Sequence, residues 1–423
     1  TEENTHANVL ETQTWNGFLA GTFYTGDHTI KFGADYEHND IYNLFGRRTN
    51  GVYRFASIAA YEAGTPNRYQ YFRPAGDDID NMAAIWSLGN VGLFAQDSWA
   101  VHANLTLSYG FRYDTPIVDD APTYNATASN AFGVRNDNTI DGKSLFQPRV
   151  GFNYTFDSER PTQLRGGMGL FRGAAASVWL SNPYSNNGIA YSDYFFSNGA
   201  GVTFVPDPDD QLSAFAPNTP GRQSIDFIDP DLGQPSAWKA NLAVEHELPW
   251  YGLVLSAELV HTSVEEGIFY QQLNLGAETA VGQDGRNIYW NTNGRNPANW
   301  NQSGTGTSVG SRANALAAYN DAIIAKSTSF GGSDQFTVGV SKPFNESDWA
   351  YGLSFTYTDA NEVSPLTSST SSSQLGNVAV FQANEEVNAT SNYEIKNRVL
   401  GTLNWKHAFF GDNNTMFSVV YES

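Results

Sequence analysis

The stretch Leu105-Thr106-Leu107-Ser108-Tyr109-Gly110-Phe111-Arg112-Tyr113-Asp114 places an apolar or aromatic side chain at every second position and a small or polar one between. Successive side chains of a β-strand point to opposite faces of the sheet, so this alternation predicts a strand with one apolar and one polar face. The same pattern recurs in residues 146–156 and 349–358. Each run is about ten residues long, which is the length that a tilted strand needs to cross an outer membrane. We expect the apolar faces to point outward, as represented by Leu107, Tyr109, Phe111, Phe152, Tyr154, Tyr351, Phe355 and Tyr357.

About twelve such strands are predicted along the chain, and their connections alternate between short turns and long excursions. The predicted strands are residues 14–24, 28–42, 88–99, 103–115, 145–156, 162–173, 236–248, 252–264, 330–342, 348–358, 395–407 and 414–422. Hairpins with every short turn on one rim and every long loop on the other are typical of outer-membrane barrels, with the turns periplasmic and the loops extracellular. The sequence therefore predicts an all-β fold: a partial transmembrane antiparallel up-and-down β-barrel with long extracellular loops, in which residues 1–423 form part of a single barrel domain.

The composition agrees with a membrane barrel and excludes several other classes of protein. Only 16% of the residues are charged, against roughly 25% in typical soluble domains, and 14% are aromatic. No uninterrupted apolar run reaches about 18 residues, so a helical membrane span is not expected. The net charge of −21 argues against a nucleic-acid partner, because phosphates need cations. The chain has no cysteine, which excludes thiolate catalysis and cysteine-ligated metals.

Aromatic residues gather where the predicted strands meet the short turns. They are Trp99, Trp250, Tyr251, Phe344, Trp349, Trp405, Phe409 and Phe410. Aromatic girdles mark the membrane interfaces of barrels. The alternative is that these side chains cap a soluble core, but the alternation of loop lengths favours the membrane.

Two neighbouring segments carry a family resemblance. Residues 92–99, GLFAQDSW, followed by the strand quoted above, resemble a hairpin of TonB-dependent receptor barrels, and within them the Oar-like branch. Residues 26–33, 148–152, 390–393, 398–400 and 409–412 resemble further segments of the same barrels, in the same order along the chain.

The resemblance implies an outer-membrane barrel of roughly 22 strands whose lumen is closed by an N-terminal plug. No plug precedes residue 14 and no TonB-box segment is present, so we expect both to lie outside this sequence. About twelve strands cannot close such a barrel, so we expect the chain to be part of a longer one. The implied function is TonB-dependent active import of a nutrient, such as a peptide or another large substrate. The implied partners are outer-membrane lipid, the plug, the TonB complex and the imported ligand. A passive porin-like barrel, or a surface-structural or adhesive one, is the alternative.

An enzyme is not expected. Residues 306–310 match the hydrolase pattern G-x-S-x-G around Ser308, but that motif requires a strand–turn–helix elbow, and here it lies in a loop rich in Gly, Ser and Thr. The seven histidines are scattered without metal-ligand spacing. Helical spacing in residues 312–326 predicts a short helix within a loop.

Three sets of residues are candidates for function. Aromatic residues of the long loops are candidates for ligand capture, with packing between loops as an equal alternative: Trp179, Tyr184, Tyr191, Tyr194, Phe195, Phe196, Tyr289, Trp290 and Trp300. Inward-facing cations are candidates for plug contacts or for lining the import route: Arg112, Arg149, Arg165 and Lys239. The loop carboxylates of Asp207, Asp209 and Asp210 would suit a structural Ca²⁺, although solvated loop charge is the simpler interpretation. No other cofactor is expected.

Overall fold

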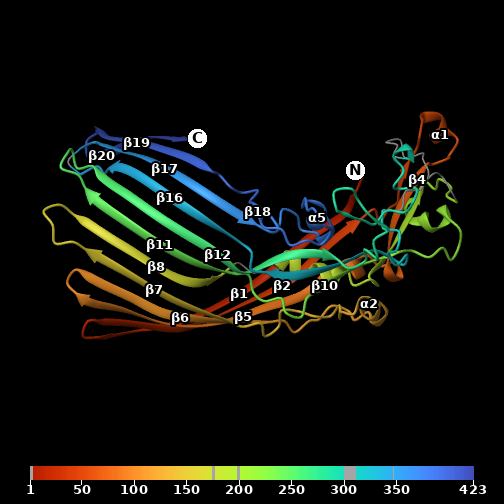
Figure 1. The fold of residues 1–423 in the computed structure, drawn as a ribbon, viewed down its shortest axis with the longest axis horizontal. Helices are drawn as coiled ribbons and strands as arrows, with labels where there is room; N and C mark the ends of the chain where they lie inside the picture. Colours follow the sequence, from red (N-terminus) through yellow and green to blue (C-terminus); the bar gives the residue numbers. More distant parts are fainter. Residues whose placement is uncertain (1–2, 174–176, 198–200, 300–310, 346) are drawn as a thin grey trace.

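The computed structural model describes residues 3–173, 177–197, 201–299, 311–345 and 347–423. Its main feature is one antiparallel path of twelve strands in which each strand pairs with the next along the path. Figure 1 shows this sheet as a curved wall. The twelve strands are β1 (Thr5–Thr25), β2 (His28–Arg47), β5 (Ala83–His102), β6 (Leu105–Ile117), β7 (Leu145–Thr155), β8 (Thr162–Arg172), β11 (Ser236–Glu247), β12 (Val254–Gln272), β16 (Gly331–Lys342), β17 (Trp349–Glu362), β19 (Asn397–Phe410) and β20 (Asn413–Glu422).

All twelve predicted strands are therefore confirmed, and so is their up-and-down order. The path begins at β1 and ends at β20, and these two strands are not paired with each other, so the sheet is an open wall with β1 along its lower side and β19 and β20 along its upper side (Figure 1). The short turns lie at one end of the strands and the long connections lie at the other (Figure 1). The turn between β1 and β2 consists of Gly26 and Asp27, and Gly26 has a φ of +54°, which glycine adopts without strain.

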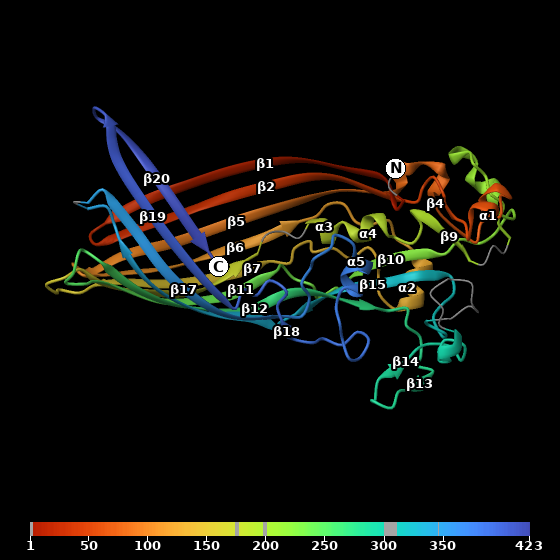
Figure 2. The same ribbon diagram turned by 90° about the horizontal axis from the view of Figure 1, so that it is seen from above.

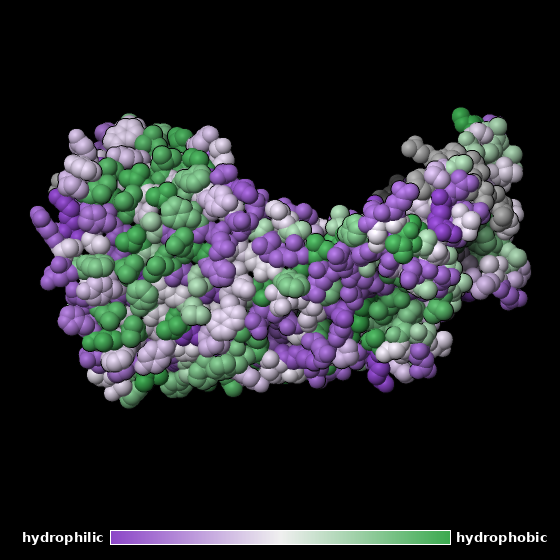
Figure 3. Space-filling view, viewed as in Figure 1, coloured by the Kyte–Doolittle hydropathy of each residue, from purple (hydrophilic) through white to green (hydrophobic). Residues whose placement is uncertain are grey.

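The two faces of the wall differ in chemistry, as the alternation predicts. Figure 3 looks onto the convex face and shows apolar residues gathered over the strands. The outward set is partly to largely exposed rather than packed into a core; Phe111 is 45% exposed and Phe355 is 38% exposed. An apolar exposed face of this extent is unusual for a protein surrounded by water and is normal for a strand face that contacts lipid.

Several strands continue past the predicted boundaries toward the long-loop end. β1, β2, β5 and β12 are 19 to 21 residues long, and their ends form the base of a folded cap. The main hydrophobic core of the chain lies in this cap: Trp86 and Leu88 of β5 pack with Ile268 and Tyr270 of β12. The cap also contains β10 (Gln223–Ile228), β15 (Tyr319–Thr328) and the helices α2 (Ala126–Phe132), α3 (Ser177–Leu180), α4 (Asn182–Ser185) and α5 (Ser371–Gly376).

The expected helix in residues 312–326 is wrong, because residues 312–318 form turns and bends and Tyr319–Thr328 is strand β15. This strand pairs with β10 on one side and with β12 on the other. Ala322, Ile323, Ile324 and Ala325 are all buried, so both faces of the strand are covered and no two-residue period appears in the sequence.

Beyond the cap, a small sheet of three strands forms a distal lobe. Its strands are β3 (Val52–Arg54), β4 (Arg68–Pro74) and β9 (Tyr191–Ser197), and helix α1 (Ile58–Glu62) lies beside them (Figure 2). Tyr69 is fully buried in this lobe and stacks on Tyr53 with 4.4 Å between the ring centroids. A separate hairpin is formed by β13 (Ala280–Val281) and β14 (Asn287–Ile288). No helix in the described residues is both long and apolar enough to cross a membrane.

Candidate functional site

The polar face of the wall carries a network of charged side chains built around Arg112. Its Nη1 donates to Asp35 Oδ2 at 2.6 Å, and its Nη2 donates to Asp35 Oδ1 at 2.8 Å. The same guanidinium donates from Nε to Asp114 Oδ2, at 2.7 Å. Asp35, Arg112 and Asp114 lie on β2 and β6, on the face opposite the outward aromatics. The predicted inward orientation of Arg112 is therefore observed.

Asp114 is the best-satisfied carboxylate of this network. It is fully buried and accepts further hydrogen bonds from Asn90 Nδ2, at 2.8 Å, and from Gln147 Nε2. A buried carboxylate is tolerated when charged and polar donors surround it in this way. Gln147 Oε1 in turn accepts from the backbone N–H of Arg172, at 2.9 Å. The network thus extends from β2 across the wall to the end of β8.

The other predicted inward cations are placed along the same face. Arg165 donates to Glu245 Oε1 at 2.6 Å. Arg149 has no carboxylate within 4.0 Å among the described residues; its guanidinium lies 4.6 Å from the ring centre of Phe171. Lys239 is exposed, and the described residues likewise give it no ion pair.

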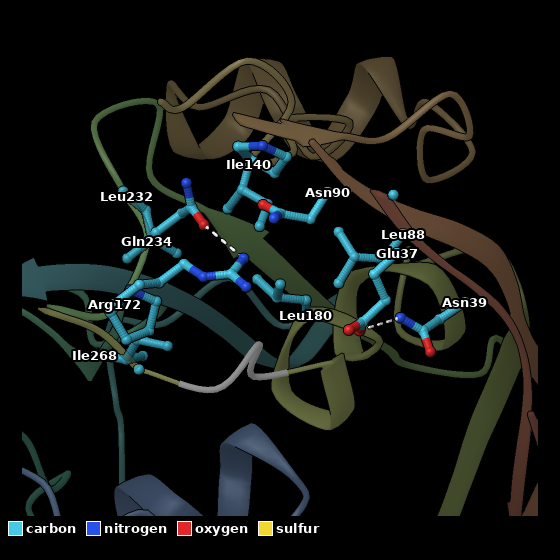
Figure 4. Close-up of a pocket in the computed structure, with 15 residues that line it drawn as sticks. Glu37, Asn39, Leu88, Asn90, Ile140, Arg172, Leu180, Leu232, Gln234 and Ile268 are labelled. Carbon is cyan, nitrogen blue, oxygen red and sulfur yellow. Dashed lines mark hydrogen bonds between the residues drawn. The ribbon is translucent and has the colours of Figure 1, made fainter. Parts of the chain in front are cut away.

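A cavity of about 200 Å³ lies where this polar face meets the cap (Figure 4). Arg172 and Glu37 approach it from opposite sides. Arg172 Nη1 donates to Gln234 Oε1 at 3.2 Å, and Glu37 Oε1 accepts from Asn39 Nδ2 at 2.8 Å. Within the described structure neither of the two charged groups has an ion-pair partner. Apolar side chains line the space between them: Leu88, Ile140, Leu180, Leu232 and Ile268.

The geometry and the lining of the cavity define what it can hold. A guanidinium and a carboxylate on opposite walls can bind a ligand with two opposite charges, and the apolar lining can cover an aliphatic part between them. The cap forms part of the wall of the cavity, since Leu180, Leu232 and Ile268 line it and belong to the core cluster of the cap. A ligand in the cavity would therefore contact the cap as well as the wall.

The loop aromatics that the sequence proposed for ligand capture are mostly inside the cap and the distal lobe. Tyr184, Tyr191 and Tyr194 are buried, and Trp179 donates from Nε1 to the carbonyl oxygen of Ser368 at 2.8 Å. Phe196 packs against the core of the distal lobe, and Tyr289 is half-buried. Phe195 and Trp290 are more exposed, at 41% and 37%. Trp300 and Ser308 lie outside the described residues.

The acidic loop residues have local structural partners. Asp207 Oδ1 accepts from the backbone N–H of Asp209, at 3.0 Å, and Asp210 accepts from the hydroxyl of Ser213. These contacts cap and tighten the short helical turn Pro208–Ala214. Across the described residues no group of three or more His, Asp or Glu side chains is arranged to hold a metal ion.

Sequence reasoning did not single out Glu37, Arg172 or Gln234. Glu37 has a signal, because it alternates with Asp35 and Asn39 on the polar face of β2. Arg172 lies one residue before the end of the predicted strand 162–173 and is the last residue of β8. Gln234 has no such signal, because it lies in a loop whose position depends on the cap.

Comparison with solved structures finds likenesses at low sequence identity. The ferric enterobactin receptor of Pseudomonas aeruginosa matches with a TM-score of 0.48 and 13% identity, over 97% of this chain and 41% of that chain. The FrpB iron transporter of Neisseria meningitidis matches with a TM-score of 0.49 and 8% identity, over 98% and 44%. The outer membrane transporter YddB of Escherichia coli matches with a TM-score of 0.46 and 12% identity, over 94% and 40%. The chain spans less than half the length of each of these proteins.

No curated protein matches the sequence of this chain. The outer membrane beta barrel domain family, in contrast, matches residues 1–421. This match covers nearly the whole sequence and agrees with the two-faced wall of antiparallel strands, which places the protein in the bacterial outer membrane. The chain belongs to the outer membrane beta barrel domain family.

Proposed function

We propose that this chain forms part of the wall and the ligand-binding mouth of a TonB-dependent importer. The observation that carries the proposal is the position of the Glu37–Arg172 cavity, which lies between a polar, charged wall and a folded cap. A ligand held there has the cap on one side and the lumen on the other. The resemblance of residues 92–99 and 105–114 to TonB-dependent receptor barrels supports the same function.

The cavity favours a peptide-like substrate. Peptides carry separated positive and negative groups, which Glu37 and Arg172 complement, and aliphatic side chains, which Leu88 and Leu232 can contact. Arg149 and Lys239 lack ion-pair partners in the described structure, so they are free to contact carboxylates of a plug. The proposed partners are a plug that fills the lumen and a TonB complex that supplies the energy. The proposed function includes no enzymatic activity.

A passive pore is the second candidate function, and the polar inner face of the wall favours it. The cap argues against it, because the core cluster that joins Trp86 to Ile268 and Ile323 lies across the long-loop end. A large passive pore needs an open water-filled channel there.

The two functions differ in their need for energy. We would measure uptake of the radiolabelled tripeptide Ala-Leu-Ala, whose two charged ends are close enough to meet both cavity walls, by porin-deficient cells that produce the protein, with and without a protonophore. The proposal predicts uptake that stops when the proton gradient collapses. Uptake that continues unchanged without the gradient would establish a passive pore instead.

Point variants connect the uptake to the cavity. Arg172→Gln and Glu37→Gln should each lower the uptake rate at least tenfold, because each removes a charge-assisted contact. Glu278→Gln changes an exposed glutamate outside the cavity and is the matched control. Equal uptake by all three variants would show that the cavity does not take part in import.

A further inference from the structure

A second cavity, of about 220 Å³, lies on the other side of the α3–α4 segment. Its floor is the inner face of the β1–β2 hairpin near the long-loop end, and its walls come from the α3–α4 segment and residues 369–370. Leu180 lines the first cavity, whereas its neighbour Ser181 lines the second. The two cavities share no lining residue.

Among the described residues that line the second cavity, Arg47 is the one with a charged side chain. This is notable in a chain with 44 acidic and 23 basic residues. The Arg47 guanidinium lies 5.2 Å from the ring centre of Phe72 and 5.9 Å from that of Phe45. In the described part of the chain no carboxylate lies within 4.0 Å of it, and its side chain makes no hydrogen bond there. Its five N–H donors are therefore free for an anion.

Neutral hydrogen-bonding groups surround this cation. The side-chain amides of Asn8 and Asn43 face the cavity and have no hydrogen-bond partner among the described residues. Ser185, Asn182 and Thr370 add hydroxyl and amide groups on the opposite wall. Amides and hydroxyls can both donate and accept, so they suit the uncharged polar part of a ligand.

The cavity is held by the fold rather than by long flexible side chains. Asn43, Phe45 and Arg47 alternate along β2, so all three project from the same face of the strand. Phe72 and Tyr191 stack with 5.1 Å between their ring centroids, and the Tyr191 hydroxyl donates to Asn186 Oδ1 at 3.0 Å. The lining is therefore preorganised, which lowers the entropy cost of binding.

We propose that this second cavity binds the carboxylate of a ligand through Arg47, and the neutral hydroxyl or amide groups of the same ligand through the surrounding Asn, Ser and Thr side chains. An acidic sugar and the C-terminal end of a peptide share this chemistry. The inference deepens the proposed import function and rests on it for its biological meaning, because it names a chemical class for the captured molecule.

Calorimetry on the protein purified in detergent tests the inference with two probes and their neutral counterparts. The probes are D-glucuronate and N-acetyl-alanyl-alanine; the counterparts are D-glucose and the C-terminal amide of the same dipeptide. We expect at least one probe to bind, with its neutral counterpart at least tenfold weaker, because the counterpart lacks the charge that Arg47 pairs with. Binding of D-glucuronate alone identifies an acidic sugar, and binding of the dipeptide alone identifies a peptide end.

Arg47→Gln should lower the affinity for the probe that binds at least tenfold, and Arg47→Lys should lower it less because the charge remains. Arg135→Gln is the matched control, since Arg135 is an exposed arginine paired with Asp137. Slower migration of the unheated variant in electrophoresis, relative to the wild type, would reveal a folding defect. If neither probe binds, or if folded Arg47→Gln and Arg47→Lys bind as tightly as the wild type, the inference is wrong.

This measurement is independent of energised uptake. Binding in detergent requires neither a proton gradient nor TonB. Tight binding together with gradient-independent uptake would overturn the import proposal and leave the anion site standing. Energised uptake without binding of either probe would overturn the Arg47 site and leave the import proposal standing.

Discussion

Arg112 and Asp35 form a two-point ion pair across the wall, with their atoms 2.6 Å and 2.8 Å apart, although they are 77 residues apart in the chain. The strand between them, β5, has Gly92 at the crossing point. A Cβ at Gly92 would lie 2.1 Å from Arg112 Nη2 and 2.7 Å from Asp35 Oδ1. In this geometry the ion pair leaves no room for a Cβ at position 92, so a larger residue would have to displace the Arg112 or Asp35 side chain.

Gly92→Ala should displace the Arg112 guanidinium and leave the buried Asp114 with fewer donors. Losing partners of a buried polar group costs about 1–3 kcal/mol. We expect a decrease of that size in the free energy of unfolding, measured by urea denaturation in detergent micelles. Gly17→Ala is the control, because a Cβ at Gly17 would have no atom within 4 Å. Equal stability of the two variants would show that the network tolerates the methyl group.

Asp226 of β10 joins the C-terminal end of α4 to the first residue of α5 inside the cap. Its Oδ1 accepts from the hydroxyl of Ser371, at 2.6 Å, and its Oδ2 accepts from Asn186 Nδ2, at 2.7 Å. Burial raises the pKa of Asp226 to about 6, although the hydrogen bonds from Ser371 and Asn186 oppose the rise. The folded cap therefore binds a proton more tightly than the unfolded chain, whose aspartate titrates near its ordinary value.

This shift predicts a cap that becomes less stable between about pH 4 and pH 6. The stabilisation from the raised pKa is complete below the unfolded pKa and is lost as the pH rises through the folded pKa. A shift of roughly two units corresponds to up to about 3 kcal/mol. Hydrogen exchange of cap amides, corrected for intrinsic rates, should show this loss in the wild type.

Asp226→Asn should remove most of that pH dependence, because asparagine keeps the shape and is always neutral. Asp209→Asn changes an exposed loop aspartate and should retain the wild-type profile. A pH profile of Asp226→Asn identical to that of the wild type would assign the effect to another group.

Trp86 attaches the α3–α4 segment to β5. It is buried, stacks on Tyr184 with 5.0 Å between the ring centroids, and donates from Nε1 to Ser181 Oγ at 2.9 Å. Trp86→Ala should destabilise the cap by about 3–5 kcal/mol, as for other large buried aromatics. Because this segment borders both cavities, ligand binding at each should weaken as well.

Trp86→Phe separates packing from hydrogen bonding at the same position. It retains most of the stacking and loses the N–H donor, so the stability of the cap should fall by about 1 kcal/mol. Hydrogen exchange in residues 177–185 measures both variants. Wild-type protection in Trp86→Ala would mean that other contacts hold the segment.

The strands could be predicted from the sequence because each crosses between two different environments. Lipid on one side and a polar lumen on the other impose a two-residue period, which Tyr109 and Arg112 show directly. The same period correctly placed Arg149, Arg165 and Lys239 on the inner face.

The cap could not be predicted in this way, because its elements are covered on several sides. Ile323 and Ile324 of β15 are both buried, so the strand has no polar face to mark it. The cavities need loops that are distant in sequence, such as those of Leu180 and Leu232, to meet. Asn43, Phe45 and Arg47 alternate along β2 but lie beyond the predicted strand 28–42, and nothing in the sequence showed what would cover these side chains.

The import proposal rests on a wall with lipid on its convex face and water on its inner face. The chain contains no cysteine, so single cysteines placed at positions 353 to 357 can each carry one fluorescent label. In liposomes of brominated lipid, labels replacing Leu353, Phe355 and Tyr357 should be quenched strongly, and labels replacing Ser354 and Thr356 should not. A uniform degree of quenching at all five positions, or the opposite alternation, would contradict the membrane wall and every functional proposal built on it.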